Sequence, residues 1–165
     1  DVWSDIACPW CYVGKRRFEA ALASFPHAAE VELVWRSFEL DPSAPAVPDP
    51  EPTYTERRAR KFRTSSAQAE AMLRQMTETA AAEGLEFHFE RTRGGNTLAA
   101  HRLLHLAHER GVQGALKERL FRALQTFAGQ TLDERNLKRL LTSIEESGGE
   151  PFTDDVTVVV VSRKE

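Results

Sequence analysis

The cysteine pair of this chain lies where a strand is expected to run directly into a helix. Cys8 and Cys11 are the only cysteines among the 165 residues, and they lie three positions apart. Val2 to Ile6 reads as a short strand, and Pro9 is of a residue type favoured in the first turn of a helix. Two cysteines cannot form the disulfide framework of a chain of this size, so their spacing needs another explanation.

The position of the motif Cys8-Pro9-Trp10-Cys11 favours redox chemistry. Free amide hydrogens and the helix dipole favour a negative charge at a helix start, which lowers the pKa of a thiol placed there. We therefore expect Cys8 to be the attacking thiolate and Cys11 to resolve a mixed disulfide. Pro9 and Trp10 are candidate substrate-binding residues. Trp10 supplies no imidazolium beside Cys8, so we expect a less oxidising pair than those of the strongest periplasmic oxidants.

A strand, a helix and a second strand are expected within about the first forty residues. The helix that begins near Pro9 is ended by Pro26. Val31 to Trp35 reads as the second strand, continuing toward Phe38 and Leu40. This order is the beginning of a parallel α/β sheet.

A proline-rich connection then leaves the sheet and leads into a helical region. Five prolines between Asp41 and Pro52 exclude regular structure there. Thr53-x-x-Glu56 and Ser65-x-x-Gln68 are capping-box patterns, each predicting a helix start. The spacing of Met72 and Met76 places both on the core face of the second of these helices.

Three further helices and one strand are expected in the rest of the chain. Asn96 and Thr97 start the first helix, and Leu116 to Leu124 mark the second. Thr131 opens the third. Val156 to Val161 is a β-branched run typical of a strand buried on both faces. The predicted architecture is α/β, with a small sheet built from both ends of the chain and interrupted by a helical insertion.

Composition excludes several classes of protein. Hydrophobic residues at 41% and charged residues at 28% are globular values. A net charge of -3 argues against nucleic acid as a partner, and no apolar run reaches the roughly 20 residues of a membrane helix. The chain opens with strand-like residues instead of a signal sequence, which favours a cytoplasmic location. It lacks an initiator Met, which indicates a segment or a processed product.

Two features have less specific interpretations. His101, His105 and His108 share one helical stripe and could complete a zinc site with the two cysteines, but their distance along the chain is not a zinc-finger spacing. A redox pair needs no metal, and we expect neither metal nor cofactor. The basic residues between 57 and 63 are interpreted as a solvated helix face.

Three segments resemble the DsbA-like oxidoreductases of the FrnE type. They are Ser4-Asp5-Ile6-Ala7-Cys8-Pro9-Trp10-Cys11-Tyr12-Val13-Gly14-Lys15, Trp35-Arg36-Ser37-Phe38-Glu39-Leu40-Asp41-Pro42 and Asn96-Thr97-Leu98-Ala99-Ala100-His101-Arg102. The resemblance covers about residues 1 to 124. It implies a thioredoxin fold with an all-helical insertion, thiol–disulfide exchange, Cys8 and Cys11 as the redox pair, and a cleft near Asn96, Thr97 and His101. The implied parts are residues 1–42 for the first part of the core, 43–148 for the mostly helical insertion and 149–165 for a closing strand.

The end of the chain departs from that family's pattern. The family supplies a cis-proline turn facing the cysteines, and Pro151 is the candidate for it here. We expect Pro151 to lie near Cys8 and Val156 to Val161 to pair with the second strand. Residues 131–165 resemble instead the C-terminus of 2C-type metal-dependent protein phosphatases, in which Asp154 would bind metal.

The sequence thus predicts a thiol–disulfide oxidoreductase whose partners are protein thiols and disulfides, or glutathione. Related families suggest an alternative, which is a glutathione-dependent isomerase or transferase of the 2-hydroxychromene-2-carboxylate isomerase or kappa class. A second alternative is a non-catalytic zinc- or protein-binding module.

Overall fold

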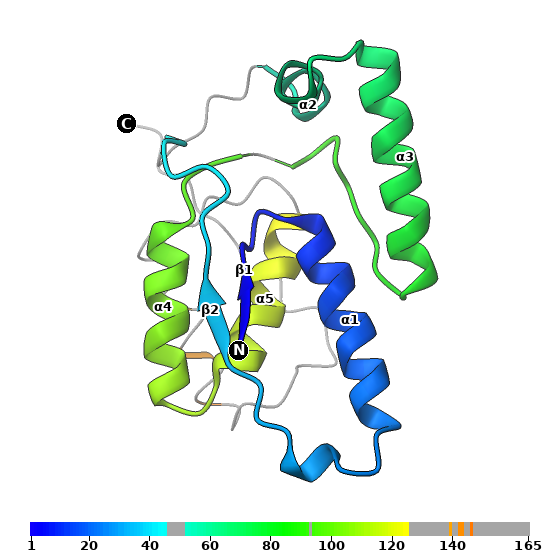
Figure 1. Ribbon diagram of the computed structural model, residues 1–165. Helices are drawn as coiled ribbons and strands as arrows, with labels where there is room; N and C mark the ends of the chain where they lie inside the picture. The colour runs from blue at the N-terminus through cyan, green and yellow to red at the C-terminus, as the bar shows by residue number, and fades with distance from the viewer. Residues whose placement is uncertain (46–51, 93, 126–138, 140–141, 144–145, 147–165) are drawn as a thin grey trace.

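The computed structural model describes residues 1–45, 52–92, 94–125, 139, 142–143 and 146. Its elements, in chain order (Figure 1), are β1 (Val2–Ser4), α1 (Pro9–Ala23), a short 3-10 helix (Ala28–Glu30), β2 (Trp35–Ser37), α2 (Tyr54–Phe62), α3 (Ser66–Ala82), α4 (Leu98–Glu109) and α5 (Gln113–Gln125). The predicted helix after Thr131, Pro151 and the Val156–Val161 run lie outside the described residues, apart from the four isolated positions.

The sheet of the described part consists of β1 and β2, which pair in parallel. Val2 lies opposite Trp35 and Ser4 opposite Ser37. Parallel neighbours need a crossover connection, and α1 supplies it, as the predicted strand–helix–strand order requires. Figure 1 shows α4 on one side of the two strands and α1 on the other, with α5 behind them.

The second strand lies further along the chain than predicted. Val31 is exposed and precedes the pairing, which begins where the N–H of Val2 donates to the carbonyl of Val34 at 2.9 Å. At Trp35, the Gln113 side chain bonds both backbone groups, accepting from the N–H at 2.9 Å and donating to the carbonyl at 3.0 Å. A side chain from α5 therefore occupies an edge that a further strand would otherwise pair with, an arrangement that local apolar patterning cannot reveal.

Both predicted capping boxes are present. The N–H of Glu56 donates to the Thr53 hydroxyl at 3.3 Å, and the Glu56 carboxylate accepts from the N–H of Thr53 at 2.8 Å. Ser65 and Gln68 exchange the equivalent pair of bonds at 3.2 and 3.1 Å. These reciprocal bonds satisfy amides that a helix start leaves unpaired, and so they begin α2 and α3.

The core lies between α1, α3, α4 and α5. Tyr12 of α1 is stacked on Phe121 of α5, with ring centroids 4.8 Å apart. Met76 is buried in α3 as predicted, whereas Met72 is 49% exposed, so its prediction as a core residue was wrong. The buried line of α3 runs through Leu73, Met76 and Ala80, and Met72 lies beside that line on the solvent side. None of the helices in the described ranges combines the length and apolar character needed to cross a bilayer.

Candidate active site

The cysteine pair lies at the N-terminus of α1. Cys8 is the N-cap residue, with φ −93° and ψ 110°, and Pro9 occupies the first helical position. The N–H of Cys8 donates to the carbonyl of Asp5 at 3.1 Å, and that of Cys11 donates to the carbonyl of Cys8 at 3.0 Å. Both thiols are free and partly exposed. The strand-to-helix junction predicted from the sequence is confirmed.

The two thiols differ in acidity. A hydrogen bond from the Cys11 thiol lowers the pKa of Cys8 to about 6. Partial burial opposes this shift, and the N–H groups of Cys11 and Trp10 add to it. The same contact with Cys8, together with burial, raises the pKa of Cys11 above its usual value. At neutral pH the arrangement therefore favours a thiolate at Cys8 and a thiol at Cys11, the charge distribution that exchange chemistry needs.

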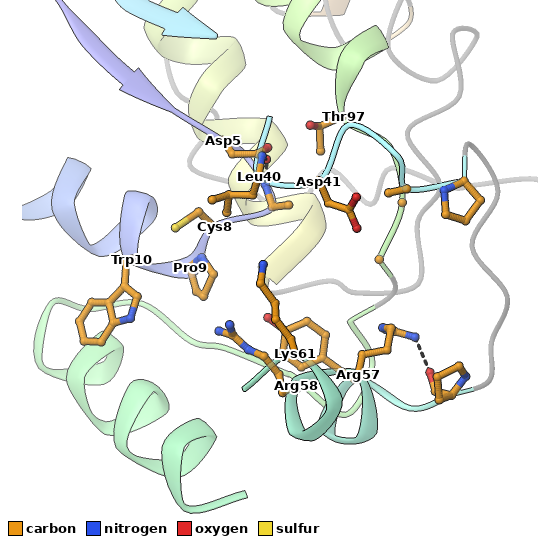
Figure 2. Close-up of a pocket in the computed structure, with 17 residues that line it drawn as sticks. Asp5, Cys8, Pro9, Trp10, Leu40, Asp41, Arg57, Arg58, Lys61 and Thr97 are labelled. Carbon is orange, nitrogen blue, oxygen red and sulfur yellow. Dashed lines mark hydrogen bonds between the residues drawn. The ribbon is translucent and has the colours of Figure 1, made fainter. Parts of the chain in front are cut away.

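A pocket of about 360 Å³ opens beside Cys8 (Figure 2). Of the two cysteines, Cys8 is the one that lines it. Pro9 and Trp10 also line it, and the Trp10 side chain is 53% exposed. Tyr54, the first residue of α2, also lines the pocket; burial raises its pKa, and the Cys8 thiolate adds to this shift. A substrate sulfur entering this pocket would meet Cys8 before Cys11.

Asp5 fixes the loop that precedes the pair. It is 2% exposed, and its carboxylate accepts from the N–H of Ala7 at 3.1 Å and from that of Leu40 at 2.7 Å. Burial opposes ionisation, but His101 and these two amides hold the pKa of Asp5 below its usual value. Asp5 thus ties the active-site loop to the segment that follows β2.

Lys117 is a buried cation that sequence reasoning missed. It is 0% exposed, and its ammonium donates to the Ser4 hydroxyl at 2.5 Å. Burial lowers the pKa of Lys117 to about 8, and the positive charge of Lys117 partly offsets the raised pKa of Cys11. A signal was present, because Lys117 is four positions after Gln113 and three before Leu120, and so shares their helical face.

The other predicted cleft residues occupy different places. Thr97 lines the pocket as the N-cap residue of α4. Asn96 links the start of α4 to the segment after β2. Its side-chain NH2 donates to the backbone carbonyl of Pro42 at 3.2 Å, and its side-chain oxygen accepts from the N–H of Leu98 at 2.9 Å. His101 is 2% exposed, and its Nε2 lies 3.4 Å from Asp5 Oδ1, so it supports the loop from the interior. Pro151 lies outside the described residues.

The zinc interpretation gains no support from the geometry. Within the described ranges, no three His, Cys, Asp or Glu side chains converge in a way that could hold a metal ion. His101 faces Asp5, and the ring of His105 shares a 2.8 Å hydrogen bond with the hydroxyl of Ser37. These histidines are engaged with residues other than the cysteines.

The basic cluster of α2 is more than a solvated face. Arg57, Arg58 and Lys61 line the pocket beside Cys8, whereas Arg60 and Arg63 are exposed and lie outside its lining. The interpretation from sequence therefore holds for only part of the cluster. The position of α2 beside the pocket of Cys8 is a tertiary feature, which a local charge pattern does not show.

A sequence profile of the DsbA-like thioredoxin domain matches residues 1–150. The chain belongs to the DsbA-like thioredoxin family. Membership confirms the predicted fold class, which is thioredoxin-like and mixed α/β, with mostly helical content and a small sheet. The match extends beyond the roughly 124 residues that carried the resemblance in the sequence. The FrnE subtype and the phosphatase-like end of the chain stay predictions.

Two relatives of this DsbA-like chain illustrate the likeness. A probable DsbA oxidoreductase from Streptomyces coelicolor, known from its crystal structure, matches with a TM-score of 0.74 and 39% identity, over 90% of this chain and 66% of that chain. The uncharacterized protein YwbO of Bacillus subtilis (strain 168) is 45% identical over 49 residues, which are 30% of this chain and 22% of YwbO. The chain therefore covers only part of each relative.

Proposed function

We propose that this DsbA-like protein is a thiol–disulfide oxidoreductase of the FrnE type that acts through Cys8 and Cys11. The observation that carries the proposal is the asymmetry of the pair. Cys8 lines the pocket and has a lowered pKa, whereas Cys11 lies one helical turn inside α1 and has a raised pKa. The name of the Streptomyces coelicolor relative, a probable DsbA oxidoreductase, supports the same activity.

The exchange proceeds in two balanced steps. The Cys8 thiolate attacks one sulfur of a substrate disulfide, a new S–S bond forms, and the substrate's other sulfur leaves with the electron pair and takes up a proton. Cys11 then loses its proton and attacks the Cys8 sulfur, which releases the second substrate thiolate and forms the Cys8–Cys11 disulfide. The substrate is reduced to two thiols and the protein pair is oxidised; the reverse sequence oxidises a dithiol.

Lys117 and Asp5 are positioning residues in this scheme. The Lys117 ammonium favours the Cys11 thiolate that the second step needs, because it lowers the pKa of Cys11 against the larger effects of Cys8 and burial. Asp5 holds the loop in place through the N–H groups of Ala7 and Leu40, and its charge opposes the Cys8 thiolate. The acidity of Cys8 therefore arises at the helix start and from Cys11, and not from Asp5.

The partners we propose are protein thiols and disulfides, or glutathione, and the proposed location is cytoplasmic. A glutathione-dependent isomerase or transferase is the second enzymatic candidate. It shares the pocket beside Cys8, but it would leave both protein thiols unchanged at the end of a turnover. That difference separates the two candidates experimentally.

The test is equilibration of the protein in glutathione buffers of graded redox ratio, followed by acid quenching and mass-tagging of the remaining thiols. We expect Cys8 and Cys11 to lose their thiols together in one two-electron transition. The Cys11→Ser variant is the control, and it should carry a glutathione adduct at Cys8 instead. If both thiols of the wild type stay reduced at every ratio, the proposal fails. Glutathione binding without any change in thiol content would favour the isomerase.

A further inference from the structure

Three cations of α2 form one wall of the pocket that Cys8 lines. Lys61 follows Arg57 by four positions and Arg58 by three, so it neighbours both arginines on the helix surface, and all three line the pocket. Figure 2 shows Lys61 extending into the pocket and Arg58 pointing toward the side on which Pro9 and Trp10 lie. The chain as a whole has a net charge of -3, so this concentration of positive charge is local.

The three cations have different tasks. Arg57 is used within the fold, since its guanidinium donates to the carbonyl of Pro52 and, at 3.2 Å, to that of Thr92. Arg58 lies against aromatic rings, 5.5 Å from the centroid of Tyr54 and 5.3 Å from that of Phe62. These contacts direct its guanidinium without neutralising it.

Arg58 and Lys61 make no ion pair with a carboxylate of the described residues. Among the described residues, the acidic side chains that line the pocket are Asp5 and Asp41, and each accepts hydrogen bonds from other groups of the protein. Asp5 is buried, with its oxygens on two backbone amides. Asp41 accepts from the hydroxyl of Ser43 at 2.7 Å and from its N–H at 3.2 Å. Both cations can therefore bind negative charge that a ligand brings into the pocket.

We infer that the pocket selects disulfides whose flanking groups carry carboxylates, with Arg58 and Lys61 binding those carboxylates while Cys8 attacks the sulfur. The inference rests on the proposed function and narrows it to a substrate class. Two sources share this chemistry, namely an acidic segment of a protein and a small acidic disulfide. A pocket of about 360 Å³ whose lining includes the half-exposed Trp10 is compatible with either source.

The test compares exchange rates of the reduced protein with matched disulfides. Dithiodipropionate carries two carboxylates, and its diamide is a neutral molecule of nearly the same shape. A disulfide-linked peptide with Glu on both sides of its cysteine, and the same peptide with Gln, form the second pair. We expect the acidic member of at least one pair to react about fivefold faster at low salt, and the preference to fall toward unity at about 1 M salt. The pair that shows the larger preference identifies the source.

Charge variants show whether α2 is responsible. Arg58→Glu and Lys61→Glu should each remove or reverse the acidic-to-neutral rate ratio. Arg60→Glu is the matched control, since it makes the same charge change on an exposed position of α2 outside the pocket lining, and it should keep the wild-type ratio. Asp41→Asn should raise the ratio, because it removes a negative charge from the pocket.

The outcomes separate this inference from the proposed function. If the neutral disulfides react but the acidic ones are not preferred, the inference is overturned and the proposed function stands. The same holds if Arg60→Glu changes the ratio as much as Lys61→Glu does. If none of the four disulfides reacts with the pair, the proposed function itself fails.

Discussion

The ammonium of Lys117 donates a 2.5 Å hydrogen bond to the hydroxyl of Ser4, 113 positions away in the chain. The same ammonium lies 5.2 Å from the ring centroid of Trp35 and 5.1 Å from that of Phe121. A fully buried cation thereby joins α5 to β1, the strand that leads to Cys8. Because burial lowers the pKa of Lys117, the stability of the fold depends on the protonation state of this lysine.

Replacement of Lys117 should change how stability depends on pH. Burial lowers the folded-state pKa of Lys117 to about 8 from an ordinary 10.5. Below pH 8 the lysine is protonated in the folded and in the unfolded state, and burial of its charge destabilises the fold. Between pH 8 and 10.5 the folded protein has released this proton and the unfolded chain has not, so the stability of the wild type rises with pH. Relative to Lys117→Met, the wild type should gain up to about 3 kcal/mol across this window.

Urea unfolding of the reduced proteins at both ends of that window measures the effect. The Lys117→Met variant serves as the reference for the wild type, because the other groups that titrate in this window are present in both proteins. A stability difference that stays constant with pH would show that burial does not disfavour the charged lysine.

Substitution of Asp5 should separate support of the loop from the acidity of Cys8. Asn has one acceptor oxygen, so Asp5→Asn leaves the N–H of Ala7 or that of Leu40 unpaired and should lower the free energy of unfolding by about 1–3 kcal/mol. The Asp5 charge raises the pKa of Cys8, so the variant should also react with an alkylating reagent at lower pH than the wild type. Urea unfolding and the pH midpoint of Cys8 alkylation check the two effects. An upward shift of that midpoint would contradict the assigned role of Asp5.

Glu118 should matter for stability alone. Its carboxylate accepts from the Tyr12 hydroxyl at 2.5 Å and from the Lys15 ammonium at 2.7 Å, in a site where Lys15 is nearly buried. Glu118→Gln should lower the free energy of unfolding by about 2 kcal/mol, because it removes one of the two carboxylates that pair with the buried Lys15 ammonium. The comparison is Glu19→Gln, which removes the other carboxylate that pairs with Lys15. That carboxylate is 41% exposed, so its loss should cost less than about 1 kcal/mol. Equal effects of the two substitutions in urea unfolding would argue against this ranking, and neither should alter the alkylation rate of Cys8.

The single-cysteine variants should behave differently toward a substrate disulfide. Cys11→Ser keeps the attacking thiolate but lacks the resolving thiol, so mixed disulfides through Cys8 should accumulate. Cys8→Ser leaves only the thiol with the raised pKa and should trap almost nothing. Non-reducing electrophoresis with mass-spectrometric assignment of the adduct distinguishes them. Trapping by Cys8→Ser in place of Cys11→Ser would reverse the assigned roles.

Features encoded by neighbouring residues were predictable from the sequence. To predict the cysteine pair at a helix start, only the strand-like residues before it and Pro9 are needed. To predict the two capping boxes, only residues three positions apart are needed. The start of α4 is also local, since the side-chain oxygen of Asn96 accepts from the N–H of Leu98. In each case the interacting backbone groups lie within one helical turn, so their arrangement follows from composition and spacing.

Features that depend on distant partners were missed. β2 begins at Trp35 instead of Val31. The backbone N–H of Trp35 donates to the side chain of Gln113, which is 78 positions away in the chain. Asp5 holds the active-site loop through a hydrogen bond from the N–H of Leu40, 35 positions away in the chain. Lys117 contacts the strand before that loop through the hydroxyl of Ser4. Long-range pairing of this kind is set by how helices pack, and no window along the chain contains both partners.

The central claim is that Cys8 is the reactive thiolate and Cys11 the protected partner. Timed alkylation of the fully reduced protein across a pH series, with each site quantified by mass spectrometry, tests it most directly. The account predicts that the Cys8 rate rises through a midpoint near pH 6 and then levels off, while Cys11 is modified far more slowly throughout. Equal rates at the two cysteines, or a Cys8 midpoint at the ordinary value of about 8.5, would contradict it.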